Sequence, residues 1–143
     1  MGDALRVARA DVEAFNAHDE GRIRELNAAN AIFEGPGEVR LEGREAATAY
    51  AMSWLNAFPD ATLTIHNELE AGDWVVQEFT FEGTHTSTLP TPAGDIPATN
   101  RRLSGRGVQI LRIEGDTVAE TRLYYDQVQL MTQLGLMPEP ATA

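Results

Sequence analysis

The sequence contains no cysteine and no long apolar run. Without cysteine, disulfides, thiolate nucleophiles and cysteine-based metal sites are excluded. No stretch approaches the roughly 20 apolar residues of a membrane-spanning helix, and the N-terminus lacks a basic segment followed by an apolar run. We therefore expect a soluble, cytoplasmic protein.

Basic residues are also scarce, with 11 against 22 acidic residues. An acidic surface is repelled by nucleic acid and by anionic membranes, so neither is an expected partner. A small hydrophobic or aromatic molecule suits this composition better. The length of 143 residues indicates one domain over 1–143, in which residues 139–143 form a frayed tail.

Sequence motifs for metal-dependent and nucleophilic catalysis are missing as well. His18, His66 and His85 are scattered and show no His-Glu-x-x-His-like spacing, which argues against a metal site. No serine lies in a Gly-x-Ser-x-Gly context. No glycine-rich phosphate loop is visible.

Helical periodicity predicts three helices in the first 58 residues. The first follows from apolar residues at helical spacing: Leu5, Ala8, Val12 and Phe15. Residues 22–29 predict a short second helix, which is followed by extended segments at 31–34 and 39–41. The third helix covers 43–58, presents a broad apolar face and is stopped by Pro59.

Strand patterns dominate the rest of the chain, at 62–70, 74–86, 101–113 and 117–125. Gly72 and Gly115 mark hairpin turns, and the proline- and glycine-rich segment 89–97 predicts a long loop, either a lid or a spacer. This order indicates an α+β fold, in which a curved antiparallel sheet wraps around three N-terminal helices. A pocket is expected between the concave face of the sheet and the third helix.

The last strand carries a chemically mixed face. Period-2 alternation groups Glu120, Arg122, Tyr124 and Asp126 on one side. In water this is an ordinary solvated face. If it lines a hollow, Asp126 becomes a proton-transferring residue with Tyr124 beside it, because desolvation raises the pKa of a carboxyl while a nearby Arg122 lowers it.

Inward parity selects further candidates from the other strands. Phe79, Phe81 and His85 share the apolar parity of their strand, although a bulge at Gly83 would reverse it. His85 is then either a hydrogen-bonded structural residue or a proton-sharing one. Gln109 has the parity of two apolar neighbours, so its buried amide needs a partner from protein or ligand.

Aromatic residues of the third helix complete the predicted wall. Tyr50, Trp54 and Phe58 recur at i, i+4 and i+8, a spacing that favours core packing and leaves some rings to contact a planar ligand. Phe33 closes the same wall.

In the strand at 62–70, His66 is expected to point outward, and Leu63, Ile65, Asn67 and Leu69 inward. Outward-facing residues of the next strand predict a sheet-to-sheet homodimer: Trp74, Val76 and Thr80.

Five short segments together resemble one family in order and spacing: Phe15-Asn16-Ala17-His18-Asp19, Ala57-Phe58-Pro59-Asp60, Gly83-Thr84-His85-Thr86, Tyr125-Asp126-Gln127 and Gln133-Leu134-Gly135-Leu136. In these the chain resembles the SnoaL-like polyketide cyclases of the nuclear transport factor 2-like superfamily. The resemblance implies a cone-shaped α+β barrel, cystatin-like in form, with a deep pocket. It also implies intramolecular aldol ring closure without metal or cofactor, with Asp126 as acid/base. Ser87 departs from the glycine that often follows the Thr-His-Thr segment.

Three functional hypotheses remain open at the level of sequence. The first is a cyclase that uses Asp126 with Tyr124 and His85. The second is another pocket enzyme, either a ketosteroid-isomerase-like proton shuttle with a donor pair for the oxyanion or an epoxide hydrolase. The third is a non-catalytic protein that binds a small ligand.

Overall fold

The computed structural model describes residues 2–137, so the predicted tail at 139–143 lies outside the described residues. Four helices and eight strands follow one another along this part of the chain. The helices are α1 (Asp3–Asn16), α2 (Glu20–Leu26), α3 (Arg44–Ala57) and α4 (Gln127–Gln133). The strands are β1 (Asn27–Gly35), β2 (Val39–Glu42), β3 (Thr62–Ala71), β4 (Trp74–Thr84), β5 (Leu89–Thr91), β6 (Gly94–Ile96), β7 (Arg102–Glu114) and β8 (Thr117–Tyr125).

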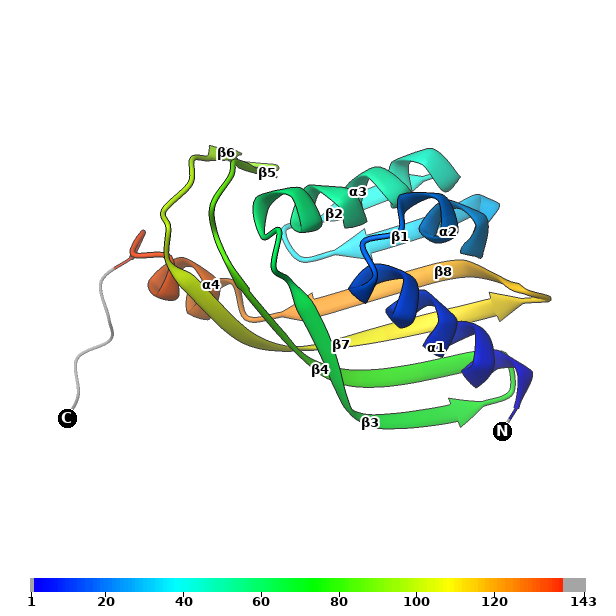
Figure 1. The fold of residues 1–143 in the computed structure, drawn as a ribbon. Helices are drawn as coiled ribbons and strands as arrows, with labels where there is room; N and C mark the ends of the chain where they lie inside the picture. The colour runs from blue at the N-terminus through cyan, green and yellow to red at the C-terminus, as the bar shows by residue number, and fades with distance from the viewer. Residues whose placement is uncertain (1, 138–143) are drawn as a thin grey trace.

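Six strands form one curved sheet in the order β2-β1-β8-β7-β4-β3, and α1, α2 and α3 lie over its concave side (Figure 1). The predicted α+β fold is confirmed. The prediction of an antiparallel sheet was wrong at one position, because β1 pairs with β8 in parallel. That pairing joins segments about 90 residues apart in sequence, so no local turn signal announces it.

The predicted segments between 62 and 125 correspond closely to the observed strands, and β8 spans the predicted 117–125. Gly72 and Gly115 lie in the two hairpin turns with φ of 60° and 58°, a backbone region that glycine tolerates best. The loop predicted at 89–97 contains the small hairpin β5–β6, which Leu89, 1 % exposed, anchors in the core. Helix α4 was not predicted.

A bulge changes the facing of residues along β3. Ile65 pairs with Phe79, but the register shifts before Asn67, which pairs with the outward-facing Glu78. The prediction that Asn67 and Leu69 point inward was therefore wrong, and Leu69 is 60 % exposed.

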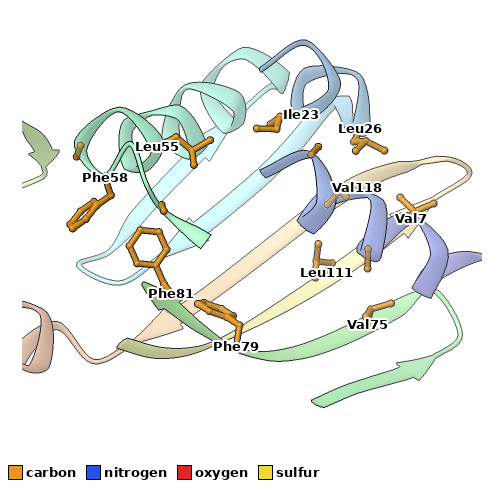
Figure 2. Packing of buried hydrophobic residues seen from close by; sticks show 14 of the residues in the cluster. Val7, Ile23, Leu26, Leu55, Phe58, Val75, Phe79, Phe81, Leu111 and Val118 are labelled. Atoms are coloured by element: carbon orange, nitrogen blue, oxygen red, sulfur yellow. The ribbon is translucent and has the colours of Figure 1, made fainter. Parts of the chain in front are cut away.

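The core fills the space between the helices and the concave face. Figure 2 shows apolar side chains from both layers converging there, including Val7 of α1, Leu55 of α3, Phe58 just after α3, and Phe81 of β4. This packing joins the helices to the sheet. Within residues 2–137, no helix has the length and apolarity needed to cross a bilayer.

Candidate active site

A cavity of about 140 Å³ lies between the concave sheet and the helices α1 and α3. Its wall is mainly apolar, and seven of its residues are aromatic. The aromatic residues are Phe15, Phe33, Tyr50, Trp54, Phe79, Phe81 and Tyr125. Five of them were predicted to contact ligand from the sequence: Phe33, Tyr50, Trp54, Phe79 and Phe81.

The Trp54 ring is central to the aromatic wall. Its centroid lies 5.5 Å from that of Phe81 and 5.6 Å from that of Tyr125, both in edge-to-face geometry. Phe58, the residue that follows α3, is fully buried and packs against Trp54 with 5.8 Å between the ring centroids. Phe58 is therefore a core residue outside the cavity lining, enclosed by the rings of Phe81 and His85.

The sequence-based choice of the pocket-facing side of β8 was wrong. The residues that line the cavity are Thr121, Leu123 and Tyr125, whereas Tyr124 is 54 % exposed. Arg122 also lies on the outer face, where its guanidinium sits 5.5 Å from the centroid of the Trp74 ring. Alternation predicted correctly which residues between 120 and 125 share a face, but it wrongly grouped Asp126 with Tyr124, and which face turns inward depends on how the helices cover the sheet.

Asp126 lines the cavity although its strand neighbour Tyr124 does not, because it follows the last residue of β8. It is exposed, and its Oδ1 accepts a hydrogen bond of 3.0 Å from the backbone N–H of Gln129. Asp126 is thus the N-cap of α4. The spacing of Asp126 and Gln129 is the capping pattern that could have predicted this helix.

Two phenols face the cavity together. Burial raises the pKa of Tyr50 above its ordinary value, while interactions with Trp54 and Tyr125 oppose that rise. Burial, with a further contribution from the neighbouring Tyr50, holds the pKa of Tyr125 well above its ordinary value. Both hydroxyls therefore stay protonated at neutral pH. Once a ligand replaces their contact with each other, both can donate hydrogen bonds to it. Tyr125 was missed because the opposite face of β8 was preferred.

Asp11 of α1 is a second carboxylate in the wall that sequence reasoning missed. It is half-buried, and burial raises the pKa of its carboxyl to about 6. A signal was present in the sequence, since Asp11 follows Val7 and Ala8 at i+4 and i+3 and thus lies on the apolar stripe of the helix.

Gln109 lines the inner part of the cavity, as its parity predicted. Its Nε2 donates to Oε1 of Gln77 at 2.8 Å, and Gln77 in turn donates to Oε2 of Glu68 at 3.0 Å. Glu68 is also ion-paired with Arg9, with 2.9 Å between Oε1 and Nε. The buried amide predicted at Gln109 therefore has a protein partner.

His85 points inward but does not line the cavity. Its ring is fully buried, stacks on Phe58 at 5.1 Å and accepts a hydrogen bond from the backbone N–H of Thr99 through Nδ1. Burial lowers its pKa. This arrangement matches the structural role weighed for His85 and keeps it from the cavity.

The side chains that commonly bind metals are dispersed. Among residues 2–137, no group of three His, Cys, Asp or Glu side chains could hold a metal ion. The polar groups around the cavity include two carboxyls, two phenols and the Gln109 amide: Asp11, Asp126, Tyr50, Tyr125 and Gln109. Such a set can move a proton and donate hydrogen bonds to a developing oxyanion.

Comparison with protein families matches residues 5–134 to the SnoaL-like polyketide cyclase model. Two curated relatives are aklanonic acid methyl ester cyclases. DnrD from Streptomyces peucetius is 29 % identical over 141 residues, which cover 94 % of this chain and 92 % of that protein. DauD from Streptomyces sp. strain C5 is 30 % identical over 139 residues, which cover 94 % and 83 % respectively.

Solved structures share the fold. A SnoaL-like protein from Jannaschia sp. CCS1 superimposes with a TM-score of 0.82 at 19 % identity, covering 95 % of this chain and 94 % of the other. IdmH from Streptomyces antibioticus, a candidate polyketide cyclase, gives a TM-score of 0.76 at 25 % identity, with coverage of 92 % and 98 %. The α+β architecture is therefore common to these proteins.

Proposed function

The chain belongs to the SnoaL-like polyketide cyclase family, and from this premise we propose that it is a cofactor-independent enzyme that closes a ring of an aromatic polyketide precursor by intramolecular aldol condensation. The observation that carries the proposal is the composition of the cavity wall. Seven aromatic rings, two of them the phenols of Tyr50 and Tyr125, line the space together with two carboxyls. Planar aromatic substrates stack well against such walls.

An aldol closure needs a base, an acid and a stabiliser of charge. The base takes a proton from the carbon next to a carbonyl, and the resulting enolate carbon bonds to a second carbonyl carbon of the same molecule. The alkoxide then takes back a proton, so no redox partner is needed. Tyr50 and Tyr125 supply donors for the enolate and alkoxide oxygens. Asp11 and Asp126 are the two carboxyls that could carry the proton.

The first test is turnover of aklanonic acid methyl ester, the compound named in both curated relatives. We expect ring closure by the purified protein without added metal or cofactor. Tyr125→Phe should reduce turnover while binding persists, because it removes one donor and keeps the ring. Tyr124→Phe is the matched control, since Tyr124 lies on the outer face. Equal rates for Tyr125→Phe and wild type would contradict the role of the phenols.

The phenol pair also favours a second candidate, a ketosteroid-isomerase-like proton shuttle. Such an enzyme needs one carboxylate base and two donors to an enolate oxygen, and Asp11 with Tyr50 and Tyr125 provides these groups. A steroid enone is therefore tested beside the polyketide ester. Isomerisation of the enone without ring closure of the ester would replace the cyclase proposal with this one. A terpene epoxide tests the epoxide-hydrolase hypothesis in the same way: its hydrolysis without ring closure of the ester would favour that activity.

If the protein binds these compounds but converts none of the three, the enzyme hypotheses fail and a non-catalytic ligand-binding protein remains. In that case the protein should bind the ester equally well as wild type and as Tyr125→Phe. Quenching of tryptophan emission reports binding directly, because Trp54 lines the cavity.

The outer face of the sheet supports a homodimer as part of the proposal. Leu69, Val76 and Ile110 form a continuous apolar row across β3, β4 and β7, and Tyr124 is exposed on the same face. Light scattering after gel filtration should give twice the monomer mass, and Val76→Glu should give the monomer mass. A monomeric wild type would contradict this part of the proposal.

A further inference from the structure

We propose that Asp11, rather than Asp126, is the residue that carries the proton in this cavity, with Tyr50 and Tyr125 as the donors to the developing oxyanion. The inference rests on the proposed function, which requires an acid/base group in the cavity but does not by itself choose between the two carboxyls. Geometry makes the choice, because the two side chains have different surroundings and different hydrogen-bond commitments.

Asp11 is placed by its helix in an apolar part of the cavity. It lies on the buried stripe of α1, and the lining residues nearest to it in sequence are Val12 and Phe15, with Ile23 contributed by α2. Within the described part of the chain, the Asp11 carboxyl makes no hydrogen bond and no ion pair with another residue. A half-buried carboxyl with neither is free to act on a ligand that enters the cavity.

The charges around Asp11 do not neutralise it. The other ionisable groups of the lining are Tyr50 from α3, Arg106 from β7, and Tyr125 and Asp126 from the end of β8. On β3, which packs against α1, the carboxylate of Glu68 is paired with Arg9. Burial alone raises the pKa of the Asp11 carboxyl to about 6, so much of it is ionised at neutral pH while it remains a ready proton carrier.

Asp126 has the opposite character. It is exposed at the edge of the cavity, and one of its oxygens is engaged with the backbone N–H of Gln129 as the cap of α4. Water competes for the remaining lone pairs. A capping carboxylate in this position holds α4 against the cavity and is a poor proton carrier, because accepting a proton would weaken the cap.

The proposed step balances in protons and electrons. The ionised Asp11 takes a proton from the carbon between two carbonyls and becomes a neutral acid, while the electron pair of the broken C–H bond moves into the enolate. The enolate carbon forms the new C–C bond as the π bond of the attacked carbonyl becomes an alkoxide lone pair. Asp11 then returns its proton to that alkoxide, and the phenols keep theirs throughout.

Carbon-13 titration of the aspartate carboxyls tests the placement of Asp11 without any need for activity. The Asp11 resonance is assigned by its loss in Asp11→Asn, and we expect its midpoint near pH 6. Adding aklanonic acid methyl ester should shift this midpoint, because the ligand would replace cavity water around the carboxyl. A midpoint below 5, or one that the bound ester leaves unchanged, would overturn the placement.

Turnover then tests the role. Asp11→Asn should reduce turnover of the ester by roughly 10²- to 10⁴-fold with binding retained, the usual contribution of a general acid/base residue. Glu13→Gln, an exposed acid on the same helix, is the matched control and should keep the wild-type rate. Full activity of Asp11→Asn together with loss of activity in Asp126→Asn would overturn the inference and leave the cyclase proposal standing.

Failure of the proposed function has a different signature. If wild type converts none of the test compounds, the enzyme proposal fails whatever the variants do. A ligand-dependent midpoint near pH 6 would then still support Asp11 as the ionisable group at the binding site, and an unchanged midpoint would contradict that as well.

Discussion

Gln109 donates a hydrogen bond of 2.8 Å to the side-chain oxygen of Gln77, and this contact orients an amide at the inner end of the cavity. The orientation of the two amides is set by Glu68. Because an ionised carboxylate can only accept hydrogen bonds, Gln77 must turn its amide nitrogen toward Glu68. Gln77 must then present its oxygen to Gln109, which leaves the Gln109 oxygen to accept from a ligand. A substrate hydroxyl at this end of the cavity would be favoured.

Replacing Gln77 by leucine should leave the Gln109 amide without its buried partner. We expect a loss of about 1–3 kcal/mol in the free energy of unfolding, the range for an unsatisfied buried polar group. Urea denaturation measures the loss. The double variant Gln77→Leu with Gln109→Leu should recover part of it, because neither position then holds an unpaired amide. A double variant that loses the sum of both single effects would contradict the coupling.

The pH dependence of turnover should follow Asp11. Because burial raises the pKa of Asp11 to about 6, the basic form increases through that pH, and kcat/KM should rise tenfold per pH unit below 6 and level off above it. The measurement is kcat/KM for the polyketide ester between pH 4.5 and 8. A profile flat down to pH 5 would show that a group other than the Asp11 carboxyl limits the rate.

The same carboxyl should lower the stability of the protein at neutral pH. Its pKa is about 6 in the folded state against an ordinary value of 3.8, so the folded state binds more protons between these values and loses stability as the pH rises through them. The difference of about 2 units corresponds to about 3 kcal/mol. Asp11→Asn should therefore be more stable than wild type by up to this amount at pH 7.5.

The gain in Asp11→Asn should disappear below about pH 3, where the wild-type carboxyl is protonated in both the folded and the unfolded state. Thermal unfolding at the two pH values measures this. Glu13→Gln again serves as control, and we expect no such pH-dependent gain from it. Equal stabilisation at both values would point to packing rather than ionisation as the cause.

Asp126 should contribute to stability through its cap. Asp126→Ala removes the acceptor for the Gln129 N–H and should cost about 0.5–2 kcal/mol, whereas Asp126→Asn keeps a side-chain oxygen in the same place and should cost much less. Denaturant unfolding and amide hydrogen exchange in α4 measure the two effects. Similar losses in both variants would mean that the charge, not the hydrogen bond, stabilises this end of the molecule.

Local sequence patterns determined much of this protein. Alternation and turn glycines placed β8 at its observed bounds, because a strand's period and the positive φ of Gly115 are properties of short segments. Helical spacing brought Tyr50 and Trp54 to one wall. The inward position of Asp11 was also visible in the sequence, because this acidic residue interrupts the apolar stripe of α1.

Only the tertiary structure decided which groups share the cavity. Alternation assigns Tyr124 and Tyr125 to opposite faces but cannot say which face the helices will cover, and the bulge in β3 reverses the facing of Leu69 through pairing with β4. The parallel pairing of β1 with β8 joins distant segments. The pKa of Asp11 depends on the same assembly, because a carboxyl loses its water only when the sheet and the other helices close around it.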